Sequence, residues 1–417
     1  MVVKRSARSN PERHYYSLLT ILKIPIRASG RSAWYTALCA LTCAVLWVGF
    51  NVSFNYGNHI SGLFYTGARV ALPAEIENHT RRLTYDDIGY DAHFYHLIAH
   101  DPLLRRGSVT YLDNPSLRWR RIGVPGLAAL LTFGNDDFVD TAYLAIELIA
   151  VFAGAFWLSR YSAAVSWPPA FGLAFLLVPA TLVSIDRMTI DLPLAAICVG
   201  LALHERMKER VVASASFALP AASTSAMLIS AALFRETGIM VVAAWCCTRM
   251  LRKQLVGAVA CAACAIPALA WWLHVDRNVP ADGTTWIARF PFSGLIDRTL
   301  QGMDAASGRG GRAAPLLEEL ALLGIWLAVL SSIDLIRRKR FEFLELTAIL
   351  FVCLVAVLGT VEIWASAYAT GRTMSPLLLA LGLIALRDRR PVLAVPTLLI
   401  LPRIALQYAA EIRLALR

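Results

Sequence analysis

The sequence predicts an all-α polytopic membrane protein with about 11 transmembrane helices and a long first external loop containing membrane-lying helices. Of its 417 residues, 57% are hydrophobic and only 17% are charged, whereas soluble domains carry roughly 25% charged residues. The apolar residues cluster in runs of about 16–22, close to the roughly 20 that a helix needs to cross a bilayer. Such a run satisfies its own backbone hydrogen bonds only as a helix.

The net charge of +11 favours a membrane orientation signal over a nucleic-acid partner. Most of the excess lies in short Arg/Lys clusters between apolar runs, which is the pattern of cytoplasmic loops in multispan proteins. We therefore expect membrane lipids as partners and no nucleic acid. The dense clusters are Arg206/Lys208/Arg210, Arg249/Arg252/Lys253, Arg337/Arg338/Lys339/Arg340 and Arg387/Arg389/Arg390.

The chain divides into four predicted parts. Residues 1–32 form a basic cytoplasmic arm, and 33–273 form a first transmembrane module that includes the external loop 55–138. Residues 274–314 form a second external loop, and 315–417 form the C-terminal transmembrane helices. The predicted spans are 33–54, 139–158, 168–184, 190–205, 211–233, 237–250, 254–273, 315–336, 343–360, 372–387 and 391–408.

The apolar stretch Ile122–Phe133 decides the orientation. If the basic arm and all four clusters are cytoplasmic, an even number of spans must separate the arm from the first cluster. Four predicted spans already do so, and this stretch must therefore not cross the membrane. Pro125 and Gly126 weaken a helix there, so we interpret it as a helix on or in the outer leaflet. The chain then has its N-terminus inside and its C-terminus outside. The polar breaks predicted on the non-cytoplasmic face are loop 55–138, Asp186-Arg187, Arg235-Glu236, loop 274–314 and the turn before Arg372.

Asp91 stands at the start of an expected interfacial helix, Ala92–Leu104, just after the flexible Gly89. A carboxylate at a helix N-terminus is favoured by the helix dipole. Asp91 is therefore a candidate functional residue. The alternative is that Asp91 serves only as the N-cap of the helix.

His93, His96 and His100 are spaced i, i+3, i+7 and are expected on one face of the same helix. With Asp91 they would offer ligands suited to a divalent ion. The alternative is that these histidines are solvated or hydrogen-bonded. We expect no cofactor and assign no metal ligand, although a divalent metal remains possible.

Arginine alternates with tryptophan in the segment Arg118-Trp119-Arg120-Arg121. Such a segment suits a phosphate-rich headgroup layer, because guanidinium binds phosphate through two hydrogen bonds. A generic interfacial anchor is the alternative.

Three further arginines lie at the outer ends of predicted spans: Arg187, Arg235 and Arg372. Charged groups at such depth usually face a cavity or a partner. The partners open from sequence are Glu236 or Asp186 for Arg235, and Asp186 or Asp191 for Arg187.

These motifs resemble bacterial C-type (GT-C superfold) integral membrane glycosyltransferases. The resemblance is carried by Gly89-Tyr90-Asp91, His93-Phe94-Tyr95, His100-Asp101-Pro102-Leu103, Asp113-x-Pro115, Arg118-x-Arg120-Arg121-Ile122, Leu233-Phe234-Arg235-Glu236-Thr237-Gly238 and Gly371-Arg372. Members of that family have an early aspartate in a long first external loop of membrane-lying helices. They use a sugar linked to polyprenyl phosphate as donor.

The resemblance implies that 33–273 is the catalytic module and that Asp91 is the general base, which deprotonates the acceptor hydroxyl. It also implies an inverting hexosyl- or pentosyltransferase in the bacterial inner (plasma) membrane, active on its non-cytoplasmic face. The acceptor would be a lipid or a glycan. The implied substrate-binding residues are Tyr90, His93, Arg118, Arg121, Asp186, Arg187, Arg235, Glu236 and Arg372.

Two absences in the sequence favour a lipid-linked donor over a nucleotide sugar. Asp86 and Asp87 are adjacent rather than spaced as D-x-D, and no glycine-rich phosphate loop precedes a helix. A transporter or lipid flippase is the main alternative, but its site is expected near the midplane between repeated halves, and we find no internal repeat. A scaffold subunit of an envelope complex is a third possibility.

Overall fold

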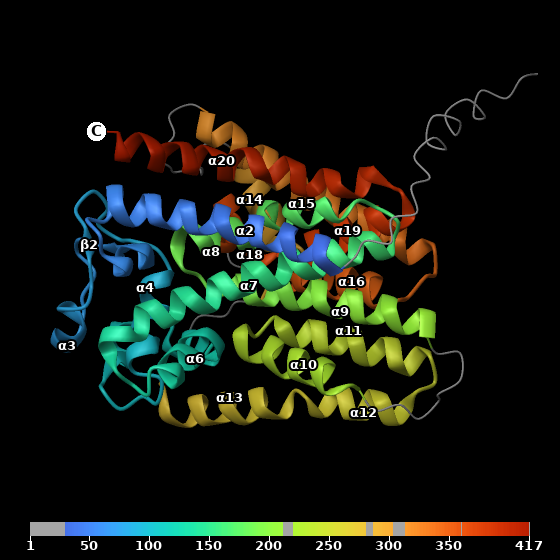
Figure 1. The fold of residues 1–417 in the computed structure, drawn as a ribbon, viewed down its shortest axis with the longest axis horizontal. Coiled ribbons are helices and arrows are strands. Elements are labelled where there is room, and N and C mark those ends of the chain that lie inside the picture. Colours follow the sequence, from blue (N-terminus) through green and yellow to red (C-terminus); the bar gives the residue numbers. More distant parts are fainter. Residues whose placement is uncertain (1–29, 212–219, 281–286, 303–312, 360, 417) are drawn as a thin grey trace, which may run out of the picture.

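The computed structural model describes residues 30–211, 220–280, 287–302, 313–359 and 361–416. It is an all-α bundle of long, roughly aligned helices (Figure 1). Two short strands, β1 (Thr66–Gly67) and β2 (Arg82–Leu83), pair in parallel within the segment that follows the first helix. Residues 1–29 of the basic arm predicted over 1–32 and part of the loop 274–314 lie outside the described residues, and residues 30–32 begin α2.

The first half of the bundle runs from α2 to α10. Its elements are α2 (Gly30–Phe50), η2 (Asn51–Asn55), η3 (Ile60–Phe64), α3 (Ala74–Glu77), α4 (Ala92–His100), η4 (Ser108–Tyr111), α5 (Pro115–Arg120), α6 (Gly123–Leu131), α7 (Asp136–Ala164), η5 (Pro169–Leu177), α8 (Pro179–Arg187), α9 (Asp191–Val211) and α10 (Ala222–Phe234).

The second half runs from α11 to the C-terminal helix. Its elements are α11 (Gly238–Leu251), α12 (Leu255–Ala263), α13 (Ile266–Asn278), α14 (Ser293–Gln301), α15 (Ala313–Arg337), α16 (Phe343–Val357), α17 (Val361–Trp364), α18 (Ala367–Thr373), α19 (Ser375–Asp388), η7 (Pro391–Ala394) and α20 (Val395–Ala415).

The prediction of about 11 transmembrane helices is wrong: in the described residues, 5 helices are long and apolar enough to cross a membrane, or up to 7 if each bent pair counts as one span. All five leave large apolar side chains exposed, as lipid-facing helices do. The chain is an integral membrane protein with several apolar helices. The five candidates are Gly30–Asn55, Asp136–Ala164, Leu255–Asn278, Ala313–Arg337 and Pro391–Ala415.

Bends and short helices account for most of the difference. The predicted spans 168–184 and 372–387 fall on pairs of helices that bend by 59° and 62°, each with a proline in the first turn of its second helix. Proline cannot continue a helix from the preceding turn. The predicted spans 211–233, 237–250 and 343–360 become helices of 13, 14 and 15 residues. Such helices cover about 20–23 Å, less than the roughly 30 Å of hydrocarbon.

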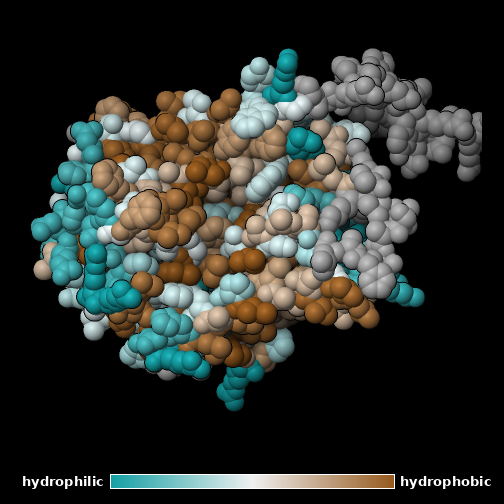
Figure 2. All heavy atoms as spheres, turned by 60° about the horizontal axis from the view of Figure 1, so that its bottom comes forward, coloured by the Kyte–Doolittle hydropathy of each residue, from teal (hydrophilic) through white to brown (hydrophobic). Residues whose placement is uncertain are grey.

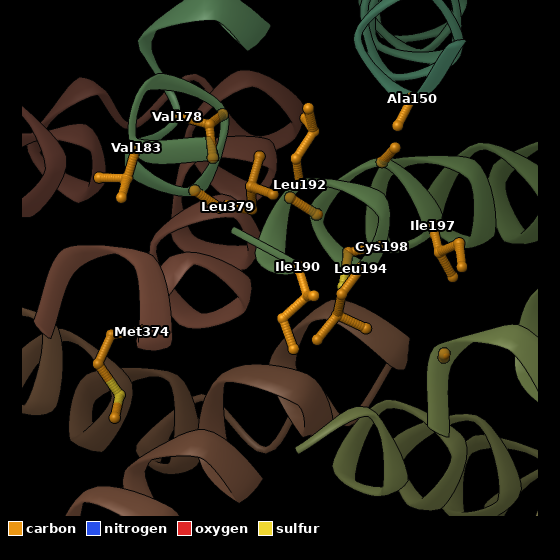
Figure 3. Packing of buried hydrophobic residues seen from close by; sticks show 14 of the residues in the cluster. Ala150, Val178, Val183, Ile190, Leu192, Leu194, Ile197, Cys198, Met374 and Leu379 are labelled. Atoms are coloured by element: carbon orange, nitrogen blue, oxygen red, sulfur yellow. The ribbon is translucent and has the colours of Figure 1, made fainter. Parts of the chain in front are cut away.

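Helix α9, predicted as span 190–205, occupies the core instead of facing lipid. Its first 13 residues are buried on every side, and its last turns carry several charged residues. Figure 3 shows Leu192, Leu194 and Ile197 of α9 in the packed interior, with Ala150 of α7 and Leu379 of α19 nearby. This helix therefore fixes the positions of the helices that bear the candidate site.

The segment between η2 and α7 forms a polar end of the molecule. It lies at the left of Figure 1, and hydrophilic side chains gather at that end in Figure 2, while hydrophobic side chains cover the middle. Helix α6 has nine residues, about 14 Å, so the stretch Ile122–Phe133 does not cross a bilayer, as predicted. Its place in the outer leaflet stays a prediction.

Helix α4 differs from the predicted interfacial helix in two ways. It ends at His100 rather than Leu104, because the Asp101 carboxylate accepts the backbone N–H groups of Arg105 and Arg106 at 2.7 and 2.9 Å. Every residue of α4 except Phe94 is buried. The helix packs against α6 and α7 and so has no face left for lipid, which corrects the interfacial interpretation.

Candidate functional site

A tight turn at Gly89 positions Asp91. Gly89 has φ +79°, and a Cβ there would lie 2.4 Å from the Tyr65 carbonyl oxygen. Gly89 pairs with Thr66 of β1, and the Tyr90 N–H donates to the Tyr65 carbonyl at 3.0 Å. Only glycine combines this left-handed backbone with so close an approach. The turn thus places Asp91 directly before the first residue of α4, at the N-cap position.

The Asp91 side chain makes no capping hydrogen bond to α4. Its carboxylate instead accepts Arg118 Nη2 at 3.0 Å on one oxygen and Arg372 Nη2 on the other. The alternative that Asp91 is only an N-cap is therefore not supported. The carboxylate lies between two guanidinium groups from distant parts of the chain.

The charges around Asp91 fix its ionisation. Burial acts to raise the pKa of Asp91, but the guanidinium groups of Arg372 and Arg118 outweigh it and hold that pKa well below its usual range. Burial also lowers the pKa of His93 to about 4, so its imidazole is neutral at physiological pH. His93 Nδ1 donates to the Tyr90 carbonyl at 2.6 Å. The site therefore presents an anionic carboxylate beside a neutral imidazole.

A cavity of about 840 Å³ opens in front of Asp91. Tyr90, Asp91 and His93 are the predicted site residues that line it, whereas Arg118 and Arg372 are not among its lining residues. The cavity is large enough for a drug-sized ligand. Its other lining residues are Arg69, Val70, Ala71, Asp87, Ile88, Gly89, Phe94, Thr110, Tyr111, Leu112 and Asp113.

Arg118 and Arg121 belong to one buried network on helix α5 and the residue after it. Arg118 binds Asp113 at 2.8 Å as well as Asp91, and Arg121 binds both oxygens of Glu236 at 2.6 and 2.7 Å. Both arginines are at most 8% exposed. This corrects the interpretation of the segment as a headgroup-contacting or interfacial anchor, because Arg118 and Arg121 form their ion pairs inside the protein. Arg120 is partly exposed and pairs with Asp276 at 2.7 Å.

Tyr95 connects the two arginines. Its hydroxyl accepts Arg121 Nη1 at 2.6 Å and Arg118 Nη1 at 3.4 Å. Burial raises the pKa of Tyr95, yet the two guanidinium groups outweigh it and bring that pKa below its usual value. Tyr95 was not assigned to the site from sequence, although it lies in the His93-Phe94-Tyr95 motif.

Arg372 and Arg235 share a third carboxylate, Asp191 at the start of α9. Arg235 forms an ion pair with Asp191, and Arg372 Nη1 lies 3.6 Å from the same carboxylate. Arg235 also donates to the Thr373 hydroxyl at 2.9 Å. Neither partner considered for Arg235 from sequence is the one observed, since Glu236 turns to Arg121.

Arg187 does pair with Asp186, at 3.0 Å, and it also binds Glu411 of the C-terminal helix at 3.0 Å. Its guanidinium lies 3.4 Å from the Tyr65 ring centre and 5.6 Å from that of Tyr90. Arg372 lies 5.0 Å from the Tyr90 ring centre. Tyr90 therefore joins the Arg187 group to the Arg372 group.

The structure thus brings all ten sequence-predicted residues into one connected network. Sequence reasoning left out several members of this network. An acidic residue within the apolar run of α20 was a usable signal for Glu411, because ionisable groups in such runs usually have a buried partner. The members left out include Tyr65, Tyr95, Asp191, Tyr368 and Glu411.

The predicted three-histidine face splits in two. His93 turns to the Tyr90 carbonyl beside the cavity, whereas His96 and His100 gather with Asp140 of α7. An ion bound by all three histidines together with Asp91 is therefore excluded by their positions. His93 precedes His100 by seven residues, about 10 Å along the helix axis, which is too far for one ion to bind both.

Comparisons with known proteins leave the family open. No protein-family profile, no curated protein and no solved structure matches this chain. What the fold shows directly is a helical, polytopic membrane protein with 5 to 7 candidate spans.

Proposed function

We propose that the chain is a membrane glycosyltransferase that moves a sugar from a polyprenyl-phosphate donor to an acceptor hydroxyl. The observation that carries the proposal is the Asp91 carboxylate, held between Arg118 and Arg372 at the edge of a cavity of about 840 Å³. In this proposal the protein works in a bacterial inner membrane, on its non-cytoplasmic face.

The donor phosphate binds where the guanidinium groups meet. Arg118 and Arg372 both contact Asp91, and Asp113 and Asp191 face the same two guanidinium groups from their other sides. Guanidinium groups bind phosphate through paired hydrogen bonds as well as they bind carboxylate. An arriving phosphate therefore competes with Asp91 for these two side chains and draws them partly away from it.

Asp91 then acts as general base. Its carboxylate takes the proton of the acceptor hydroxyl as that oxygen forms a bond to the anomeric carbon of the sugar. The bond from the anomeric carbon to the phosphate oxygen breaks on the opposite side, so the configuration inverts. The leaving phosphate keeps the electron pair, and the arginines stabilise its charge in a preorganised site.

The resting ion pairs prepare Asp91 for this role. With both guanidinium groups in place, the pKa of Asp91 stays well below its usual range, although burial opposes this, and the carboxylate is a weak base. When the donor phosphate engages Arg118 and Arg372, the opposing charges fall away and the pKa rises. Base strength would thus increase when the donor is bound.

The test uses purified protein in liposomes supplied with polyprenyl-phosphate sugars, and nucleotide sugars as a comparison, together with lipid and glycan acceptors. Mass spectrometry of the products reports transfer. The proposal predicts a glycosylated acceptor and free polyprenyl phosphate from the lipid-linked donor only. Movement of the donor across the bilayer with no new glycosidic bond would support the flippase alternative and overturn the proposal.

A further inference from the structure

A second polar cluster lies at the opposite end of α4 from Asp91. His96 and His100, in the last two turns of α4, meet Asp140 in the second turn of α7. The Nε2 atoms of the two histidines are 3.1 Å apart, and His96 Nε2 is 2.8 Å from Asp140 Oδ1. His100 Nε2 is 3.9 Å from the same oxygen. Both histidines are almost fully buried.

The three atoms fit around a single metal ion. A triangle with sides of 2.8, 3.1 and 3.9 Å has a circumscribed circle of radius about 2.0 Å. An ion at its centre would therefore lie about 2.0 Å from both nitrogens and the oxygen. Zinc bonds to histidine nitrogen at about 2.0–2.1 Å and to carboxylate oxygen at about 2.0–2.2 Å. An ion at this point would lie in the plane of the three atoms, so small shifts of the side chains are needed to reach the tetrahedral arrangement that zinc prefers.

His100 has the outer partner that is typical of a metal-bound histidine, whereas His96 Nδ1 is buried with no hydrogen-bond partner among the described residues. His100 Nδ1 lies 2.8 Å from Asp136 Oδ1, and Arg106 holds the other oxygen of Asp136 at 2.7 Å. Histidines that bind metal through one ring nitrogen almost always donate the other N–H to a carboxylate or carbonyl, which fixes the tautomer and ring orientation. Asp136 therefore directs the free lone pair of His100 Nε2 toward His96 and Asp140.

Hydrogen bonds alone explain the cluster less well. Two ring nitrogens 3.1 Å apart can share only one proton, since two N–H groups would point at each other. Asp140 Oδ1 is buried without a hydrogen-bond partner of acceptable geometry in the described part of the chain, despite its short distance to His96. A cation at the centre satisfies all three atoms at once.

We propose that His96, His100 and Asp140 bind one divalent transition-metal ion, with Zn²⁺ as the best match. The ion would cross-link α4 to α7 through these ligands. Two imidazoles and one carboxylate suit Zn²⁺ better than Mg²⁺ or Ca²⁺, which prefer oxygen ligands throughout. The fourth position would hold water. The nearest ligand is five residues from Asp91, about 7 Å along the helix axis. The ion therefore acts by fixing the helix that carries Asp91 and does not touch the reacting atoms.

The experiment measures metal binding by the full-length protein in detergent. Protein is treated with a chelator, freed of the chelator and titrated with ZnCl₂, and bound zinc per chain is determined by elemental analysis. A parallel titration with Co²⁺ reports coordination through its visible absorption, which is intense for a four-coordinate ion. We expect one ion per chain, a rise in melting temperature with Zn²⁺ and a four-coordinate Co²⁺ spectrum.

Variants then assign the ligands. His100→Gln and Asp140→Asn should each weaken Zn²⁺ binding at least 100-fold, and Asp136→Asn should weaken it about 10- to 100-fold through the outer shell. His93→Gln is the matched control, because it removes a buried imidazole of the same helix outside the cluster. Loss of binding in the control, or equal binding in all four variants and the wild type, would overturn the proposal.

A ligand variant could lose Zn²⁺ binding simply because it misfolds. The Asp136→Asn variant distinguishes this case from the loss of a metal ligand. Asp136 is partly exposed and contributes no ligand, so this variant is expected to fold. No Zn²⁺ binding by the wild-type chain at micromolar concentration would contradict the proposal. It would leave the proposed glycosyl transfer unaffected, because no step proposed for Asp91 uses this ion.

Discussion

Arg118 donates its Nη2 to the Asp91 carboxylate at 3.0 Å and the same nitrogen to Asp113 at 2.8 Å. One guanidinium group is thus shared between the proposed base and a second carboxylate on the cavity wall. Such sharing leaves Arg118 with a partner even if a substrate phosphate displaces it from Asp91. The pair can therefore open without leaving a buried charge alone, a step that is costly in buried ion pairs.

Replacing either arginine by lysine should weaken donor use while preserving the fold. Lysine keeps the charge but lacks the planar fork that holds carboxylate or phosphate at two points. We expect Arg118→Lys and Arg372→Lys to lower kcat/KM for the lipid-linked donor about 10- to 100-fold. Initial rates against donor concentration measure this. Unchanged kinetics in both variants would show that neither side chain binds the donor.

The contribution of Asp91 to stability should persist to low pH. Burial acts to raise the pKa of Asp91, but the guanidinium groups of Arg372 and Arg118 have the larger effect, so the pKa is lowered overall. A carboxyl group with a lowered pKa stabilises the folded state above its unfolded pKa, and the contribution is lost as pH falls through the folded pKa.

The difference in unfolding free energy between wild type and Asp91→Asn should therefore be constant from about pH 8 to pH 5 and shrink only below about pH 4. Equilibrium unfolding in detergent at several pH values measures it. A difference that already shrinks between pH 7 and pH 6 would mean that Asp91 is not held by these arginines.

The turn before Asp91 should tolerate no side chain. Gly89→Ala adds a Cβ 2.4 Å from the Tyr65 carbonyl oxygen at a positive φ. Gly107 is the matched control, since its φ is +74° but a Cβ there meets nothing within 4 Å. Gly107→Ala should cost about 1–2 kcal/mol from backbone strain alone.

Gly89→Ala should cost about 1–3 kcal/mol more than the control and should also reduce transfer, because Asp91 moves with the turn. Unfolding free energies and transfer rates of both variants test this. Equal losses in the two variants would show that the close approach at Gly89 has no consequence.

The Arg121–Glu236 pair should behave as a buried ion pair. Removing one partner leaves an uncompensated charge, so Arg121→Met should cost about 3–5 kcal/mol. The double variant Arg121→Met/Glu236→Gln should recover a large part of this loss. A double-mutant cycle on unfolding free energies gives the coupling, and additive effects would indicate that the pair does not form.

Composition and local pattern were enough to predict an all-α membrane protein, because burial in lipid demands long apolar helices. They did not predict the number of spans. Apolar residues fill the first 13 residues of α9 as densely as in a lipid-facing helix, yet this part of the helix is buried within the protein. The bends before Pro179 and Pro376 depend on packing as well as on proline. A window of sequence does not distinguish these cases.

Ten residues of the candidate site were predicted from the sequence, but several further members and most of the ion pairs were not. Asp91 and Arg118 are 27 residues apart, and Asp91 and Arg372 are 281 apart, so no local pattern joins them. The same limit explains why Asp191 was not recognised as the partner of Arg235. The Arg118-Trp119 segment was misread because arginine beside tryptophan is typical both of a headgroup layer and of a buried ion-pair network.

The most direct test of the central claim compares single-turnover sugar transfer by Asp91→Asn with transfer by Asp87→Asn. Both variants remove one negative charge from the same cavity wall, but only Asp91 lies between Arg118 and Arg372. The account predicts that Asp91→Asn slows transfer from a polyprenyl-phosphate sugar at least 100-fold, while Asp87→Asn stays within about threefold of wild type. Equal rates in the two variants would contradict it.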